Sequence, residues 1–362
     1  MANIFQNKTF ILILIPLVAL LLYFLFPSLL KVILFVLLAI IVTILAAIIY
    51  VGYKFKQPNI PWTDEDGLKY ENVQYSQEDK KLNTYDIYIP KNANNQKNLA
   101  LVLYIHGGAW MGGDKKEHIS DCRKLAKKGY ITATMNYTLL DAKKFKDENP
   151  PTIPRMISEI KLCISHILQF TNKENLNINQ MALCGNSTGG NLAMLFTFSQ
   201  RNFEIPIRFL SIKAAPVDFN ILFKTDKKKL EKLENNLKTG ELDSEDVKSK
   251  NDIDSLILCC TGKKYESQNY HQDEIDGLIS NSSPLKYITK TSIVPAILAY
   301  GDKDQFTIPL HYEKLVEKYK EFSGKYELIR FPNSGNTLWN DPDKTKKYEE
   351  TLTQWCKEYF GY

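Results

Sequence analysis

The sequence lacks the residue patterns of several common functional classes. The spacing of its six cysteines fits no metal site, and two of them are adjacent in apolar surroundings, which favours buried free thiols over disulfide bonds. These cysteines are Cys122, Cys163, Cys184, Cys259, Cys260 and Cys356. The 46 lysines and arginines exceed the 41 aspartates and glutamates only modestly, and the excess is dispersed, which argues against a nucleic-acid partner. No nucleotide-binding motif occurs either, so we expect neither a metal nor a cofactor.

Charge is almost absent from one long segment near the N-terminus. Residues 10–53 are nearly all apolar and include a single charged residue, Lys31. This run is too long for the apolar core of a secretory signal and long enough for two membrane-spanning helices. We therefore predict a transmembrane hairpin with helices at residues 10–26 and 32–53, a single tilted helix being the alternative. Residues 1–9 are then a short N-terminal tail, and residues 54–68 are a linker.

The lysines around this segment predict on which side of the membrane the rest of the chain lies. Lys8, Lys54 and Lys56 flank its two ends, whereas Lys31 lies in the turn. Because cytoplasmic flanks carry the excess of positive charge, we expect a membrane localisation with the main domain in the cytoplasm. The lack of a disulfide pattern points the same way.

The rest of the chain alternates short apolar runs with helical patterns, which is typical of one large α/β domain with a mostly parallel sheet. The runs that predict buried strands are residues 99–105, 178–183, 207–217, 294–300 and 326–331. Residues 221–281 break the alternation, because they are rich in Lys, Glu and Asn and contain no buried-strand pattern. We expect a helical insertion there, with the core at residues 69–220 and 282–362.

A strand-turn-helix pattern surrounds Ser187. The predicted strand at 178–183 leads into the motif G-N-S-T-G at residues 185–189, and a helical pattern follows. Gly185 and Gly189 flank the serine, as a tight turn without space for side chains requires. Such a turn exposes the serine beside a helix N-terminus, which favours negative charge. The motif fits a serine nucleophile, and taken alone it fits a glycine-rich structural turn about as well.

A second motif shifts this balance. The sequence H-G-G-A-W at residues 106–110 follows the predicted strand at 99–105. Its consecutive small residues let backbone N–H groups point into a cavity, as an oxyanion hole requires. We expect Gly108, Ala109 and Thr188 to supply the three donors. Both motifs together, each directly after a strand, are much harder to obtain by chance than either alone.

In these motifs and their order, the chain resembles the α/β-hydrolase fold family, in particular the esterase and lipase group with an HGGG-type oxyanion loop. The resemblance covers residues 69–362. It implies an α/β-hydrolase core, a cap formed by residues 221–281, and hydrolysis of a carboxylic ester through a Ser187 acyl-enzyme without a cofactor. Thr188 stands where relatives usually have alanine, a mild change because this position acts through its backbone N–H.

The resemblance also implies a catalytic acid in a turn after a late strand. Asp302 and Asp304 both follow the predicted strand at 294–300. The family's Gly-x-x-Asp spacing, counted from Gly301, selects Asp304, with Asp302 as the fallback. Without the resemblance, two aspartates in a turn are usually turn formers with solvated side chains.

The catalytic histidine of the family is missing. After the predicted strand at 326–331, relatives carry Ser-Gly-His where this chain has Ser334, Gly335 and Asn336. An asparagine amide can orient a hydroxyl group but cannot accept and return its proton. We therefore expect Ser187 to be almost unactivated, because a serine hydroxyl needs an adjacent base.

The five histidines of the chain all precede this position, and none follows His311. His311 is one candidate for a substitute base, because it follows Asp304 on a predicted helix. An ordinary histidine on the helix surface is the better interpretation of this residue. His271 lies in the expected cap and ranks lower. His106 opens the oxyanion loop, where we expect a structural role, and His118 and His166 look like ordinary helical residues.

Two functions therefore remain open. The first is a membrane-anchored serine esterase or lipase-like enzyme, strongly impaired, that acts on a small or lipid-derived ester. The second is a pseudohydrolase that keeps the pocket as a ligand-binding or interaction module at the membrane. Retention of Ser187, Asp304 and the loop at 106–110 favours the enzyme, because a long-abandoned site is expected to decay elsewhere too.

Overall fold

In the computed structural model of the chain, the structure describes residues 60–362 apart from 94–97, 146–148, 201–202, 224–226 and 266–269. Before residue 60 it describes only Val18, Val36 and residues 40–43. The predicted transmembrane hairpin, residues 10–53, otherwise lies outside the described residues and remains a prediction. Within the described part of the chain, no helix has the length and apolar character needed to cross a membrane. The chain divides into two compact units, Met1–Pro58 and Asn59–Tyr362, and the fold below is that of the second.

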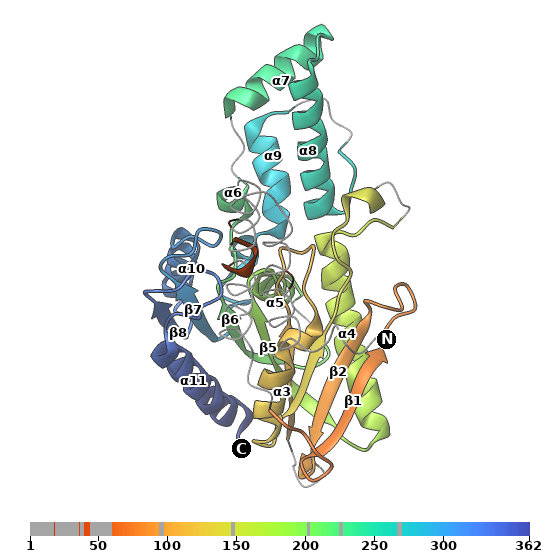
Figure 1. The fold of residues 1–362 in the computed structure, drawn as a ribbon, viewed down its shortest axis with the longest axis vertical. Helices are drawn as coiled ribbons and strands as arrows, with labels where there is room; N and C mark the ends of the chain where they lie inside the picture. Colours follow the sequence, from red (N-terminus) through yellow and green to blue (C-terminus); the bar gives the residue numbers. More distant parts are fainter. Residues whose placement is uncertain are drawn as a thin grey trace. The chain divides into compact units, whose positions relative to one another are not determined.

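An eight-stranded sheet runs through this unit in the order β1-β2-β4-β3-β5-β6-β7-β8 (Figure 1). The strands are β1 (Gly67–Gln74), β2 (Thr84–Pro90), β3 (Leu99–Ile105), β4 (Ile131–Met135), β5 (Ile178–Asn186), β6 (Ile207–Lys213), β7 (Ala296–Gly301) and β8 (Tyr326–Phe331). β2 pairs antiparallel with β1 and β4, and every other pairing is parallel. The sheet is therefore mostly parallel, as predicted, and the strand before Ser187 lies near its centre.

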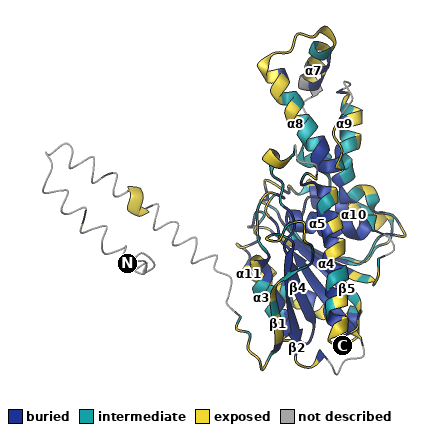
Figure 2. Ribbon diagram, turned by 90° about the vertical axis from the view of Figure 1, so that its right-hand side faces the viewer, coloured by how far each residue is buried: buried dark blue, intermediate teal, exposed yellow. Residues whose placement is uncertain are grey.

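Helices cover both faces of the sheet, so the central strands are buried between two layers (Figure 2). α3 (Ile119–Ala126) and α11 (Pro342–Phe360) lie on one face, and α4 (Ile153–Lys173), α5 (Thr188–Ser199) and α10 (Leu310–Glu321) on the other. The residues of β3 alternate between the two cores: Val102 packs with the first layer, and Leu101 and Leu103 pack with the second. Burial on both faces explains why such strands appear in the sequence as continuous apolar runs.

The insertion expected at residues 221–281 lies between β6 and β7. It contains α7 (Lys227–Thr239), α8 (Ser244–Thr261) and α9 (Gln272–Ile279), preceded by the short α6 (Phe219–Leu222). Figure 1 shows α7, α8 and α9 projecting beyond one end of the sheet. Because β6 leads directly into the insertion, the insertion leaves the sheet at the carboxyl end of a parallel strand, the same edge at which Ser187 lies.

The start of the core differs from the prediction. β1 begins at Gly67, two residues before the predicted boundary at residue 69. β1 is an edge strand, and most of its residues are exposed or half-buried. An edge strand with solvated side chains carries little apolar signal, so its ends are hard to recognise in the sequence.

A buried ion pair joins the edge of the sheet to the segment after residues 106–110. The Lys115 ammonium donates to Asp86 Oδ1 at 2.7 Å and to Asn72 Oδ1 at 2.8 Å, and only 2% of the Lys115 side chain is exposed. The Lys115 N–H also donates to Asn136 Oδ1 at 2.6 Å. Since Asp86 lies on β2, this pair fixes the segment after the glycine loop against the sheet.

We predict that Lys115→Met destabilises the chain by about 3–5 kcal/mol, because it leaves the buried Asp86 carboxylate without its cation. Urea unfolding of the variant and the parent chain measures the difference. The matched control is Lys124→Met, which breaks the partly exposed pair with Glu349 and should cost at most about 1 kcal/mol. Equal losses in the two variants would contradict the buried pair's role.

Candidate active site

Ser187 occupies a sharp turn between β5 and α5. Its φ of 49° and ψ of −124° are unusual for a residue with a side chain. A Cβ atom on Gly185 would lie 2.5 Å from the carbonyl oxygen of Gly189. A Cβ atom on Gly189 would lie 2.2 Å from the carbonyl oxygen of Ile105. Both flanking positions therefore admit only glycine, and the strained turn leaves Ser187 at the carboxyl end of a central strand.

The loop at residues 106–110 lies directly against this turn. A Cβ atom on Gly107 would come within 3.1 Å of the Ser187 Cβ. The φ angles of Gly108 and Ala109 are 117° and 53°, so the backbone turns sharply here. In the described part of the chain, the N–H groups of Gly108, Ala109 and Thr188 have no hydrogen-bond acceptor. Three unpaired donors near one serine hydroxyl are the arrangement that stabilises an oxyanion.

Side chains hold this loop in place. The Thr188 hydroxyl accepts the N–H of Trp110 at 3.4 Å, so this threonine contributes a side-chain contact as well as its N–H group. The Tyr137 hydroxyl donates to the carbonyl oxygen of His106 at 2.9 Å, and the two rings stack with centroids 4.4 Å apart. His106 Nδ1 in turn donates to the carbonyl oxygen of Gly107 at 2.7 Å. Burial lowers the pKa of His106 to about 4, so its ring is neutral at pH 7.

His118 belongs to the same network, although the sequence suggested an ordinary helical residue. It ends the short 3₁₀ helix η2 (Lys115–His118) and is almost fully buried. Its Nε2 lies 2.8 Å from Asn186 Oδ1, and that oxygen also accepts the N–H of Gly107 at 3.1 Å. Its Nδ1 lies 2.9 Å from Asp121 Oδ2. Only the three-residue spacing of His118 and Asp121 hinted at the pair, and nothing in the sequence linked it to Asn186.

The structure places Asp304, and not Asp302, beside Asn336. Asp304 is 4% exposed, and its Oδ1 accepts the N–H groups of Phe306 and Thr307 at 2.8 and 2.9 Å. Its Oδ2 contacts the Thr307 hydroxyl and accepts from Asn336 Nδ2 at 2.9 Å. Asp302 instead forms a two-bond ion pair with Arg330 on β8. Four polar groups therefore hold the Asp304 carboxylate, as a buried catalytic acid requires.

Asn336 lies where the resemblance places a histidine. Besides Asp304, its Nδ2 donates to Thr307 Oγ1 at 2.9 Å and to the carbonyl oxygen of Ala214 at 3.2 Å. Thr307 is fully buried between Asp304 and Asn336, and no sequence pattern indicated its part in the site.

Ser187 and Asn336 are anchored at the same strand end, because they bond to consecutive carbonyl groups at the carboxyl end of β6. The N–H of Ser187 donates to Lys213 at 2.7 Å, and the Asn336 amide donates to Ala214. Asn336 makes no hydrogen bond to Ser187, and the Ser187 hydroxyl has no hydrogen-bond partner among the described residues. The arrangement thus brings together a serine in a tight turn, a buried carboxylate and unpaired N–H groups, while asparagine stands where the resemblance implies a histidine base.

The other histidines do not supply that base. His311 is fully buried on α10, which corrects its interpretation as a surface histidine. Its Nδ1 accepts the N–H of Val217 at 3.3 Å, and burial lowers its pKa to about 4. The proton therefore resides on its Nε2, so the ring has no free lone pair for a serine proton. His271 pairs with Glu234 in the insertion, and His166 contacts the Tyr85 hydroxyl on β2.

The family model described as BD-FAE matches residues 85–319, a span that contains Ser187 and Asp304 and ends before Asn336. A protein of Acanthamoeba polyphaga mimivirus, described as an alpha/beta hydrolase, is 30% identical over 132 residues, which are 36% of this chain and 34% of that protein. Kynurenine formamidase of Salmo salar is 26% identical over 125 residues, 34% of this chain and 37% of the relative. The chain therefore spans about a third of the length of these curated relatives.

Solved structures share the fold over most of the chain. Esterase B from Lactobacillus rhamnosis matches with a TM-score of 0.57 at 18% identity, over 88% of this chain and 94% of the esterase. A truncated carbohydrate esterase from gut microbiota matches with a TM-score of 0.57 at 16% identity, over 83% and 99% of the two chains. At these identities the likeness concerns the arrangement of strands and helices.

The neutral state of His311 predicts a loss of stability in acid. Its pKa of about 4 in the folded chain lies below the ordinary value of about 6.5. Between these values the unfolded chain binds a proton that the folded chain does not bind. The contribution to stability is therefore complete above about pH 6.5 and is lost as the pH falls towards 4. His311→Asn, whose Oδ1 can still accept the Val217 N–H, should show a smaller decrease of the unfolding free energy over this range.

Urea unfolding at several pH values measures this effect, with the exposed His271→Asn as the matched control. If the unfolding free energy of His311→Asn fell as steeply with decreasing pH as that of the parent chain, the buried neutral histidine would not contribute to the acid sensitivity.

Proposed function

The chain belongs to the BD-FAE family of esterase-type α/β hydrolases, and we propose that it is a serine hydrolase of carboxylic esters whose activity is strongly reduced by Asn336. The observation that supports this proposal most is Ser187 in a strained turn beside three unpaired N–H groups. A strained backbone is retained only where the surrounding structure holds it in place, and such strain is concentrated at active sites.

In the proposed reaction, Ser187 Oγ attacks the ester carbonyl carbon. The carbonyl oxygen gains negative charge and accepts hydrogen bonds from the N–H groups of Gly108, Ala109 and Thr188. The alcohol leaves and takes up a proton, and the acyl group remains on the serine. Water then hydrolyses the acyl-enzyme, which releases the carboxylic acid and restores the hydroxyl.

Asn336 limits this reaction at the proton transfers. Its Nδ2 can only donate, and its carbonyl oxygen is too weak a base to take the proton of Ser187. Removing the base of a serine triad lowers turnover by a factor on the order of 10⁶. A rate acceleration of roughly 10³–10⁴ over the uncatalysed reaction in water remains, because the oxyanion hole and substrate binding still contribute. Slow acylation of Ser187 with an activated ester is the expected residual activity.

Exposed apolar side chains favour an ester with an apolar acyl chain. Five large apolar side chains that are exposed follow the candidate site residues closely along the chain: Met111, Phe306, Ile308, Leu310 and Trp339. They belong to the segments that carry the oxyanion loop, Asp304 and Asn336. Apolar side chains that gather around a polar site are typical of ligand-binding surfaces.

A second candidate function is a pseudohydrolase that binds a ligand without turnover. This function is favoured by the hydrogen bond between Asn336 and Asp304. The Asn336 amide donates to the Asp304 carboxylate in place of a histidine N–H, so the buried carboxylate stays paired. A site that is stable without a base can serve as a binding pocket.

The change Asn336→His should raise hydrolysis of p-nitrophenyl esters by roughly 10³-fold or more, because an imidazole can accept the Ser187 proton while donating to Asp304. Asn336→Gln is the matched control and should give no gain. Ser187→Ala in the Asn336→His background should abolish it. Comparing acetate, butyrate and octanoate esters tests the apolar side chains, which predict a preference for the longer acyl groups.

A parent chain that is already fast and does not respond to Asn336→His would overturn the missing-base explanation. A fluorophosphonate that labels Ser187 in neither chain would favour the binding module.

We further propose that residues 10–53 anchor the hydrolase in a membrane, on the basis of their apolar sequence. Removing residues 1–56 should release a folded domain into the aqueous phase, because the linker separates the apolar run from β1. Fractionation of the full-length and truncated chains with and without vesicles measures this. Complete partition of the truncated chain into vesicles would show that another segment binds lipid.

A further inference from the structure

We propose that His118 is a positioning residue of this hydrolase: held by Asp121, it donates to Asn186 and thereby fixes the oxyanion loop against Ser187. The inference rests on the proposed function. It concerns a buried titratable residue outside the Ser187, Asp304 and Asn336 arrangement.

The hydrogen bonds of Asn186 define the role of His118 Nε2. A backbone N–H can only donate, so the Asn186 atom that faces the N–H of Gly107 is Oδ1. The same oxygen lies 2.8 Å from His118 Nε2. An acceptor must be met by a donor, so Nε2 carries a proton.

The second ring nitrogen also faces an acceptor. His118 Nδ1 lies 2.9 Å from Asp121 Oδ2. Burial alone would raise the pKa of Asp121, but the positive charges of Lys213 and His118 lower it to about 2. Asp121 is therefore ionised and accepts only, so the His118 ring lies between two acceptors, Asp121 Oδ2 and Asn186 Oδ1.

Neighbouring groups hold the His118 ring in this orientation. The Tyr104 ring of β3 stacks on the imidazole with centroids 5.1 Å apart. Asp121 holds Nδ1 from α3, and the positive charges of Lys213 on β6 and Lys124 act on the Asp121 carboxylate.

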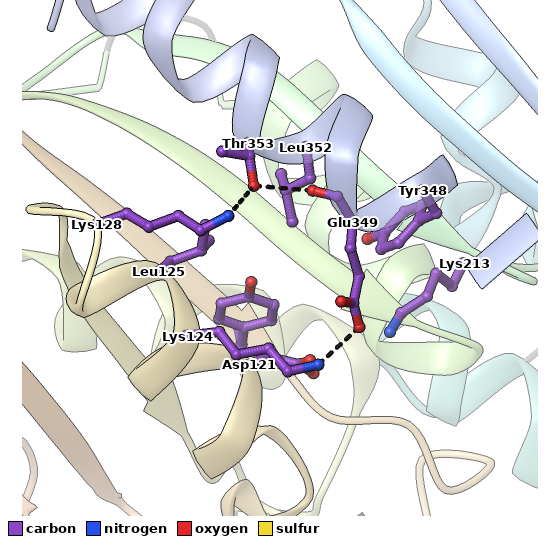
Figure 3. Close-up of a pocket in the computed structure, with 10 residues that line it drawn as sticks. Asp121, Lys124, Leu125, Lys128, Lys213, Tyr348, Glu349, Leu352 and Thr353 are labelled. Carbon is purple, nitrogen blue, oxygen red and sulfur yellow. Dashed lines mark hydrogen bonds and ion pairs between the residues drawn. The ribbon is translucent and has the colours of Figure 1, made fainter. Parts of the chain in front are cut away.

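Asp121 borders a cavity of about 40 Å³ between α3 and α11, into which Lys213 also points (Figure 3). The Lys124 ammonium is compensated by Glu349 of α11 at 2.7 Å. The cavity brings Asp121 close to solvent, since 17% of its side chain is exposed.

Removal of the His118 ring would leave Asn186 Oδ1 with only one of its two donors. The Asn186 side chain would then turn away, and the N–H of Gly107 would lose its acceptor. Because Gly107 adjoins Gly108, the oxyanion donors would shift relative to Ser187. Misplacement of this kind reduces turnover more than substrate binding.

The test uses the full-length chain with Asn336→His, in which turnover is measurable. His118→Leu should lower kcat on p-nitrophenyl butyrate roughly 10- to 100-fold, the scale of a misplaced catalytic group, with little change in KM. His118→Gln keeps a donor to Asn186 and should recover most of kcat. His166→Gln, on α4, is the matched control and should leave kcat unchanged.

Two further measurements do not need activity. Nitrogen-15 spectra of the histidine rings should show a proton on Nε2 of His118, and His118→Leu should speed hydrogen exchange in residues 106–112. An unchanged kcat in His118→Leu, or a His118 Nε2 without a proton, would overturn the inference while leaving the proposed function intact. If Asn336→His gives no Ser187-dependent hydrolysis, the proposed function fails, and the ring spectra and exchange rates alone decide the role of His118.

Discussion

The close packing of two backbone turns, one after β3 and one after β5, is the constraint on which the candidate site depends. Gly189 leaves no space for a side chain because the carbonyl oxygen of Ile105 lies against its α-carbon. Two hydrogen bonds cross the same contact, from Gly107 to Asn186 and from Trp110 to Thr188. Ser187 and the loop at residues 106–110 are therefore parts of one closely packed unit, and none of these contacts involves the residue at position 336.

Asn336 keeps the buried carboxylate paired although it is not a histidine. The Asp304 carboxylate has donors from the backbone, from Thr307 and from Asn336, so it remains satisfied in a buried position. An alanine at 336 would remove one of these donors. Compared with the histidine that the resemblance implies here, asparagine keeps a donor to Asp304 but offers no proton acceptor, so we expect stability and catalysis to respond differently to this position.

Local sequence information predicted the parts of the site that depend on the backbone. The turn around Ser187 and the loop at 106–110 were recognisable because only glycine fits at their tightest positions. The preference for Asp304 over Asp302 came from the spacing that the resemblance implies. His311 was misinterpreted because the residues that bury it come from elsewhere in the chain, including Val217. His118 was missed because its partner Asn186 is distant in sequence and polar residues carry no periodic signal of burial.

The sequence by itself determined the two tight turns, the apolar strands of the central sheet and the absence of a histidine after residue 311. These are properties of apolar periodicity, glycine placement and residue type, which act over a few neighbouring positions. Only the tertiary structure decided which distant polar side chains meet: Thr307 with Asn336, and His118 with Asn186. Such contacts join residues at or beyond the carboxyl ends of different strands, and patterns over neighbouring positions do not reveal which of these ends lie together.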